Sequence, residues 1–349
     1  MNLNHQSKIW LILIALWVIN GSSFLAIKVA IDTIPPLLSA GIRFSFAGAI
    51  LFSIYFLEIN KSRFKDRVRN TNTNQNSLQG LQGQTLEPQK KPNREHITLG
   101  QWKDSVILGV TLFLGGQGLL TWGAQYLSSG MTGLLNSTIP LWVAIIGYII
   151  YRKIKKGAIG QSMSKAKVVG LAAGFGGLML LVAPSIGSGE LSPVGTLALI
   201  ISSISWAIGS LYSTRAKLPV NILASSGMIM ITGGLMLTAV SFAFGEYKFL
   251  DLMQISSQSL IAQIYLIAII TIVGFTDFYW LLRVTSASLA NTFAYVSPVI
   301  AVLLGWAVLH ENLTITTIIA MVIILLGVAL MVTKKKAPKK STKNPMKPS

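Results

Sequence analysis

The sequence predicts an all-α integral membrane protein with ten transmembrane helices in two inverted five-helix repeats. Composition is the first observation, because 52% of the 349 residues are hydrophobic and only 11% are charged, which is more apolar surface than one soluble core can bury. The second is a set of ten apolar runs of about 20 residues, a length that matches the roughly 30 Å core of a bilayer. The third is a segment that recurs with the opposite charge at its end.

The ten apolar runs read as helices rather than strands. Strands of a membrane barrel would alternate polar and apolar residues over about ten positions, and the sequence lacks such segments. The first run is long and has no small-residue cleavage site, so it is predicted to be a retained helix. The runs cover residues 9–31, 37–57, 105–126, 131–151, 167–185, 193–212, 220–244, 260–282, 287–309 and 315–333.

Two polar segments divide the predicted helices into domains. The stretch TNTNQNSLQGLQGQ lies within residues 61–97, which lack apolar periodicity and are predicted to be a disordered cytoplasmic insertion. The end of the chain is strongly basic and is predicted to be a solvated cytoplasmic tail. The first repeat then comprises helices 1–2 in 1–60 and helices 3–5 in 98–186, the second repeat spans 187–333, and the tail spans 334–349.

The distribution of charge predicts the topology. With the N-terminus inside, 26 of the 29 Lys and Arg residues fall in inner segments, whereas Asp32, Glu190, Glu246, Asp251 and Glu311 fall outside. This is the positive-inside pattern, so both termini are predicted to be cytoplasmic in a multi-pass protein of the inner (plasma) membrane. The net charge of +18 follows loop parity instead of forming one patch, which argues against nucleic acid as a partner.

A repeat relates two distant helices. LSSGMTGLLNSTIPLWVAIIGYIIYRK (127–153) aligns with TSASLANTFAYVSPVIAVLLGWAVLHE (285–311) at an offset of 158, which superposes Pro140 on Pro298. One copy ends in Arg-Lys and the other in His-Glu. Because each repeat has five helices, the second enters the membrane from the opposite side, and each copy carries the charge that its compartment requires. Two such halves can open a midplane site to one face and then to the other.

Three stretches resemble the EamA family of the drug/metabolite transporter superfamily, especially its bacterial inner-membrane members. They are WVINGSSFLAIKVAIDTIPPLLSAGIRFSFAG near the start, ISWAIGSLYSTRAKLP at 204–219 and SASLANTFAYVSPVIAVLLGWAVLHE near the end. The resemblance covers nearly the whole chain except 61–97 and the tail. It implies ten helices in two EamA repeats and the export or exchange of small metabolites. It does not identify a compound, since members differ in substrate.

Two tryptophans occupy comparable places in the two halves. Trp17 lies in the middle of the first run, on the same helical face as Gly21, Phe24 and Lys28, and Trp206 lies in the sixth run. They are candidates for two aromatic walls of a central cavity. The alternative is that they are bulky residues packed against small ones on neighbouring helices.

The two proline-containing helices carry polar side chains near their prolines. A proline frees a backbone carbonyl, which a membrane helix tolerates where it faces protein or a wet cavity. These residues either line a substrate cavity or only form hydrogen bonds between helices. The set comprises Asn136, Ser137 and Pro140 in the fourth helix and Asn291, Tyr295 and Pro298 in the ninth, with Gln117, Trp122 and Gln125 on the third as weaker candidates.

Two ionisable residues lie within predicted spans. Arg43 lies about 10 Å inside the outer end of the second helix, and Asp277 lies roughly 8 Å from the inner end of the eighth. Intramembrane charges usually face the bundle interior, so Asp277 is a candidate for proton coupling or an interface residue bonded to nearby groups. The different depths predict that the two do not pair. Lys28 is predicted to reach outward and meet Asp32 four residues on.

These features favour a secondary transporter of a small amino-acid-like or drug-like compound, working by alternating access as an exporter or exchanger. A channel is an alternative, but rings of pore charges are not visible. An intramembrane enzyme is the other, but the sequence shows no catalytic constellation. The glycine clusters at 115–118 and 170–177 resemble helix contacts, not phosphate loops. No metal or cofactor is predicted; the expected partners are a small-molecule substrate and the bilayer, and the oligomeric state is left open.

Overall fold

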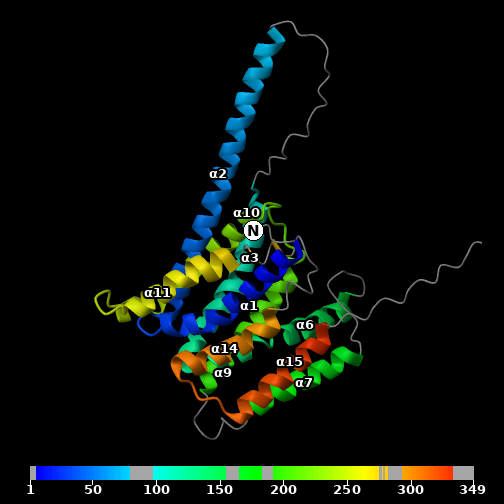
Figure 1. Cartoon of the computed structure of the whole chain (residues 1–349), viewed down its shortest axis with the longest axis vertical. Helices are drawn as coiled ribbons and strands as arrows, with labels where there is room; N and C mark the ends of the chain where they lie inside the picture. Colours follow the sequence, from blue (N-terminus) through cyan, green and yellow to red (C-terminus); the bar gives the residue numbers. More distant parts are fainter. Residues whose placement is uncertain are drawn as a thin grey trace, which may run out of the picture.

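The structure is a computed structural model that describes residues 5–78, 97–154, 165–182, 192–274, 277, 280–281 and 293–332. Within these ranges the chain forms helices and no strand, so the all-α prediction holds. Figure 1 shows a bundle of packed helices from which the far end of α2 projects. Asn291 and most of the basic tail, among the sequence-based predictions, lie outside the described residues.

Six helical segments are long and apolar enough to cross a membrane. They correspond to predicted spans one to four, six and seven, and they cover Gln6–Ala30, Pro36–Asn60, Leu99–Ala124, Ser129–Ile150, Pro193–Ser213 and Ile222–Ala243. Four shorter apolar helices lie where the other four spans are predicted, at Val168–Gly177, Ser257–Val273, Val296–Leu309 and Ile315–Gly327. The described chain is therefore a multi-pass membrane protein, and the count of ten spans stays a prediction.

The elements follow one another along the chain with short connections. In the first half they are α1 (His5–Ala30), α2 (Pro36–Leu78), α3 (Leu99–Leu108), η1 (Gly109–Gly118), α4 (Leu119–Gly123), η2 (Ala124–Tyr126), α5 (Ser129–Asn136), α6 (Ile139–Ile154) and α7 (Lys165–Val182). In the second half they are α9 (Pro193–Ser213), α10 (Ile222–Ala243), η3 (Glu246–Phe249), α11 (Ser257–Tyr265), η4 (Leu266–Val273), α14 (Phe293–Leu309) and α15 (Ile315–Val332).

Polar caps determine where several of these helices begin. The side chains of Ser128, Ser192, Asn221 and Ser256 accept hydrogen bonds from the first backbone N–H groups of α5, α9, α10 and α11. Thr98 forms a reciprocal capping box with Gln101 at the start of α3. Because the first N–H groups of a helix have no partner within it, such residues fix the starting point of an apolar run.

The helix α2 continues beyond its predicted membrane span. The sequence predicts disorder over 61–97, whereas the structure extends α2 as one helix to Leu78 (Figure 1). The local sequence KSRFKDRVR at 61–69 is rich in Lys and Arg, which are good helix formers, and it directly continues an existing helix, so no new nucleus is needed. Residues 79–96 of the predicted insertion lie outside the described residues.

Two π-helical segments occupy matching places in the two halves. One is η1 in the third membrane helix, and the other is η4 in the eighth. Adding the repeat offset of 158 to the start of η1 at 109 gives 267, one residue from the start of η4 at 266. In η4 the Thr271 hydroxyl donates to the carbonyl of Leu266, five residues back, at 2.8 Å. Such wide turns are rare and frequently lie at functional sites.

The fourth membrane helix is broken and its counterpart is continuous. The helix α5 ends at Asn136 and α6 begins at Ile139, so Pro140 stands in the first turn of α6, where its missing N–H costs no helical bond. Ser137 and Thr138 bridge the break by donating their hydroxyls to the carbonyls of Leu134 and Leu135, both at 2.6 Å. In contrast, Pro298 lies inside the unbroken helix α14 and is buried.

Small residues let α2 and α10 cross closely. Gly41 and Gly48 on α2 face Thr238 and Ile231 on α10, while Gly227 and Gly234 on α10 face Phe52 and Ser45 on α2. Adding 186 to positions 41, 48, 52 and 45 gives 227, 234, 238 and 231. Each contact therefore has a partner in which the two helices have exchanged roles, as at a twofold axis. The larger offset here reflects the additional residues between the second and third helices.

The pair α7 and α15 repeats this arrangement (Figure 1). Gly177 on α7 faces Ala320 and Ile324 on α15, and Gly327 on α15 faces Gly170 and Gly174 on α7. An offset of 150 converts one set of contacts into the other. The glycine cluster at 170–177 thus forms a helix contact, as the sequence predicts.

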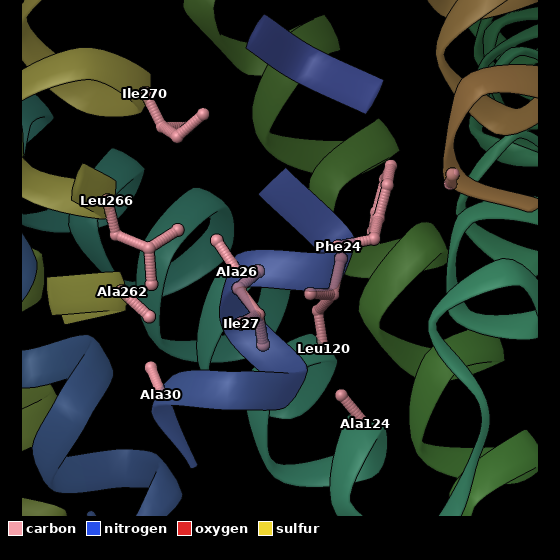
Figure 2. Close-up of a cluster of buried hydrophobic side chains, with 10 residues drawn as sticks. Phe24, Ala26, Ile27, Ala30, Leu120, Ala124, Ala262, Leu266 and Ile270 are labelled. Atoms are coloured by element: carbon pink, nitrogen blue, oxygen red, sulfur yellow. The ribbon is translucent and has the colours of Figure 1, made fainter. Parts of the chain in front are cut away.

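A buried cluster joins the two halves around α1. The side chains of Phe24, Ile27 and Ala30 on α1 pack with Leu120 and Ala124 from the third helix, with Ala262, Leu266 and Ile270 from the eighth, and with Ala301 from the ninth (Figure 2). The helix α1 packs on α14 and α11, while α9 packs on α6 and η1. These are corresponding neighbours, because the ninth helix is the repeat of the fourth and the eighth is the repeat of the third.

A buried polar pair also links the halves. The Ser39 hydroxyl on α2 donates to Oε1 of Gln263 on α11 at 2.7 Å, and Nε2 of Gln263 donates to the carbonyl of Ser39 at 2.8 Å. We expect Gln263→Leu to lower the free energy of unfolding by about 1 kcal/mol, because both bonds are lost away from water. Thermal unfolding in detergent measures this effect.

The adjacent double variant tests whether this loss comes from the pair. If the two residues stabilise each other, Ser39→Ala with Gln263→Leu should cost less than the sum of the two single variants. Strict additivity would show that Gln263→Leu acts through packing alone.

Candidate functional site

A cavity of about 960 Å³ lies at one end of the bundle. The helix α3 begins at the opposite end, and its continuation through η1 and α4 brings Trp122, Gln125 and Tyr126 to the cavity wall. The connection between α1 and α2 and the segment that follows α10 form the remaining walls. The lining residues are Ile31, Asp32, Thr33, Ile34, Pro35, Pro36, Leu37, Leu114, Gly115, Leu119, Trp122, Gln125, Tyr126, Val240, Phe244, Glu246, Phe249, Asp251 and Gln254.

Glu246 ties the wall of this cavity together. Its carboxylate oxygens accept hydrogen bonds from the backbone N–H groups of Leu37 at 3.2 Å and Leu38 at 2.9 Å, and from the Ser241 hydroxyl at 2.8 Å. The two N–H groups belong to the first turn of α2, so a carboxylate from the second half caps a helix of the first. The helix dipole favours a negative charge at that position.

Glu311 makes a second tie of the same kind. Its carboxylate accepts from Ser129 N at 2.6 Å, Ser129 Oγ at 3.0 Å and Gly130 N at 3.2 Å, which are at the start of α5. His310 precedes it with a φ of 54°, and the N–H of Glu311 donates to the carbonyl of Gly305 at 3.1 Å. This left-handed turn ends α14 and directs Glu311 toward α5. A side chain at Gly305 would collide with both Glu311 and Ser129.

The opposite end of the bundle carries a different tie. Asp104 on α3 accepts from the Tyr212 hydroxyl at 2.7 Å and from the backbone N–H of Lys217. Lys103 and Lys217 are exposed beside it. The cavity end instead holds Asp32, Glu246 and Asp251. Among the residues described at the two ends, acidic side chains thus gather at one end, and these two lysines lie at the other.

Lys28 is bound at the cavity end. Its ammonium donates to the carbonyls of Ala124 at 2.9 Å and Gln125 at 3.2 Å, at the C-terminal end of the third membrane helix. The last carbonyls of a helix carry partial negative charge, which attracts a cation. The sequence predicts that Lys28 meets Asp32, whereas in the structure these carbonyls take its hydrogen bonds.

The structure separates the two predicted tryptophan walls. Trp17 is half-buried and packs with Leu13, Leu16, Leu281 and Trp280 in a cluster between the first and eighth helices. Trp206 is half-buried and lies over Gly116, where a Cβ would stand 3.0 Å from its ring. Neither of them is among the residues that line the 960 Å³ cavity.

The predicted polar residues fall in three places. Among the candidates that the structure describes, Trp122 lines the cavity, with Gln125, whose side chain donates to the Trp122 carbonyl at 2.9 Å. Ser137 and Asn136 lie at the break before Pro140, with Ser137 buried and Asn136 half-buried. Gln117 is half-buried in η1. Asn291 and the side chain of Tyr295 lie outside the described residues.

The two intramembrane charges have different surroundings. Arg43 is 7% exposed, and its Nε donates to the Thr271 hydroxyl in η4 at 2.9 Å. Its guanidinium carbon also lies 4.6 Å from the centre of the Phe44 ring, which is a cation–π distance. Asp277 is half-buried on the eighth helix, beyond η4. Arg43 thus connects the second and eighth helices at the π segment.

Several site residues were missed because their charges were read only as signs of topology. Glu246 and Glu311 are helix caps between the halves, and Asp32 and Asp251 line a cavity. A usable signal was the close spacing of Phe244, Glu246, Tyr247, Phe249 and Asp251, since aromatic and acidic residues alternate there. The part of the chain that the structure describes contains no group of three or more His, Cys, Asp or Glu residues that could hold a metal ion.

Comparisons with known proteins agree with this architecture. The EamA-like transporter family matches residues 86–183 and 193–333. The chain is 29% identical to the uncharacterized inner membrane transporter YedA of Escherichia coli strain K12, over 91% of this chain and 89% of that protein. It is 26% identical to the uncharacterized transporter YoaV of Bacillus subtilis strain 168, over 92% and 95%. A crystal structure that is 17% identical shares the fold with a TM-score of 0.54, over 93% of this chain and 97% of that one.

Proposed function

Because this chain belongs to the EamA-like transporter family, we propose that it is a secondary transporter that moves a small organic compound across the membrane by alternating access. The compound is a metabolite or an amphiphile, amino-acid-like or drug-like, and the protein works as an exporter or exchanger. Two repeats of inverted topology, 1–186 and 187–333, rock against each other around a shared axis. The resemblance in sequence and the packing of the helices support different parts of this proposal.

The observation that carries the mechanism is the exchange symmetry of the helix crossings. Contacts at α2 with α10 and at α7 with α15 each map onto themselves when the two helices trade places. Antiparallel helices related in this way are what an inverted repeat produces, and the matching π segments η1 and η4 agree with it. Such a protein has two equivalent conformations available, one open to each side.

The separation of charge supports the orientation. Asp32, Glu246 and Asp251 surround the cavity, while Lys103 and Lys217 lie at the other end of the bundle. Basic residues favour the cytoplasmic side, so the cavity opens outward and both termini are cytoplasmic. Trp122 and Tyr126, whose rings meet edge to face at 5.2 Å, then form one wall of the outer binding region.

Counterflow in sealed vesicles tests the function. Purified protein is placed in vesicles preloaded with one of a panel of amino acids or amphiphilic cations, and uptake of the same labelled compound is followed with and without a pH gradient. A transporter gives a transient accumulation above equilibrium. A channel gives simple equilibration, and an enzyme gives turnover that needs no compartment. Absence of counterflow for the entire panel would count against the proposal.

Trp122→Ala should weaken transport without preventing folding. The indole lines the cavity and contacts Tyr126, so its removal takes away part of the surface that holds the compound. We expect initial rates to fall about tenfold, as for loss of one well-buried aromatic contact. Leu326→Ala is the matched control, because Leu326 is 59% exposed on the far helix α15. Equal rates for Trp122→Ala and Leu326→Ala, at equal abundance, would remove Trp122 from the site.

A further inference from the structure

The cavity end carries an excess of negative charge. Three carboxylates, those of Asp32, Glu246 and Asp251, are among the lining residues, and none of the lining residues is Lys, Arg or His. The hydrogen-bond donors to Glu246 and Asp251 are neutral backbone, hydroxyl and amide groups, so these bonds do not cancel the charges. A cavity lined by one sign of charge concentrates counter-ions of the other sign.

Two lysines lie nearby and offset part of this charge. The Lys28 ammonium is bound to the carbonyls of Ala124 and Gln125, and it is four residues from Asp32. The Lys248 ammonium lies 6.0 Å from the centre of the Tyr247 ring, next to Glu246 in the sequence. Neither lysine lines the cavity. The carboxylates of Asp32 and Asp251 are both exposed, so they face the side from which a solute arrives.

Aromatic side chains form the rest of the recognition surface. Trp122, Tyr126, Phe244 and Phe249 all line the cavity. Phe244 is 75% exposed and Phe249 is 81% exposed, which leaves two large rings uncovered at this end of the bundle. Aromatic faces attract cations that have lost part of their water, and they also provide an apolar contact for bulky groups.

We propose that this cavity binds amphiphilic organic cations, with the apolar body against the aromatic wall and the positive centre near Asp32 and Asp251. A bare metal ion fits poorly, because a cavity of about 960 Å³ is of the size that holds drug-like ligands. An organic anion would face three carboxylates. This inference names the substrate class of the transporter proposed above and rests on that function for its transport part; binding itself is testable separately.

The test uses two probes of the same shape and opposite charge. Tetraphenylphosphonium and tetraphenylborate are titrated against the purified full-length protein in discs of neutral lipid, and empty discs give the background partitioning. We expect the phosphonium ion to bind at least about tenfold more tightly than the borate ion, because two exposed carboxylates act on it at short range. Equal binding of the two ions after background subtraction would overturn the proposal.

Variants assign the binding to this cavity. Asp32→Asn with Asp251→Asn should weaken phosphonium binding about tenfold and leave or improve borate binding, since only charge is removed. Trp122→Ala should weaken phosphonium binding about fivefold through the lost ring face. Leu326→Ala should change neither. An unchanged phosphonium affinity in the double Asn variant, with an unchanged unfolding temperature, would contradict the assignment.

Counterflow separates a failure of this inference from a failure of the proposed function. Counterflow of neutral or zwitterionic compounds, with no specific phosphonium binding, would leave the transporter in place and reject the cation site. Specific phosphonium binding that responds to the Asn variants, with no counterflow of any compound, would keep the site and reject transport.

Discussion

Replacing Gly234 with valine is expected to cause the largest loss of folded protein of any single change considered. A side chain at this position would meet the backbone of Phe44 and Ser45 on α2, and backbone cannot move aside as a flexible side chain can. The α2–α10 contact would have to separate, at a cost of about 3 kcal/mol. Fluorescence-detected size exclusion of the expressed protein in detergent, together with its unfolding temperature, measures the result.

The exchange symmetry adds a second expectation and supplies the control. Gly48 corresponds to Gly234 at the 186-residue offset and faces the backbone of Ile231, so Gly48→Val should be about as damaging. Gly176→Val is the matched control, because a Cβ there has nothing within 4 Å. Gly234→Val accumulating as well as Gly176→Val would show that the close crossing is not what holds α2 and α10 together.

Glu311→Ala is expected to lower the free energy of unfolding by about 2 kcal/mol, the second large effect. The substitution removes a carboxylate that accepts three hydrogen bonds at the start of α5 and leaves two backbone N–H groups there without it. It also releases a contact between the ninth and fourth helices at the acidic end of the bundle. Thermal unfolding in detergent measures the stability effect.

Ser129→Ala separates the parts of this contact. It removes the hydroxyl bond at 3.0 Å and keeps the two backbone bonds, so it should cost about 1 kcal/mol or less. Glu311→Gln should fall between the two, because an amide oxygen still accepts but carries no charge. An unfolding temperature for Glu311→Ala equal to that of the unsubstituted protein would mean that water replaces the carboxylate without loss.

The fold class was predictable because it depends on features that are local in the sequence. Long apolar runs fix the membrane helices, polar caps such as Ser192 and Asn221 fix where they begin, and Pro140 marks the break in the fourth helix. Each acts over a few residues. The helical continuation of α2 to Leu78 went the other way, since a polar segment read as disordered extends an existing helix.

The site was less predictable because its contacts join distant parts of the chain. Glu246 and Leu38 are 208 residues apart, and Glu311 and Ser129 are 182 apart. In the sequence these glutamates are only charges in short loops, and topology explains them equally well. Trp122 was recognised as a candidate, but its acidic neighbours become visible only when the connection between α1 and α2 is placed against the segment after α10.

Distances across the two ends of the bundle test alternating access most directly. The natural chain has no cysteine, so spin-label pairs can be placed cleanly at Gln125 with Gln254 across the cavity and at Lys103 with Lys217 at the opposite end. All four residues are exposed, and each pair joins the two proposed repeats. Pulsed electron paramagnetic resonance is recorded with and without a compound that shows counterflow. We expect one distance to lengthen as the other shortens; two distances that stay fixed, or that change in the same direction, would contradict alternating access.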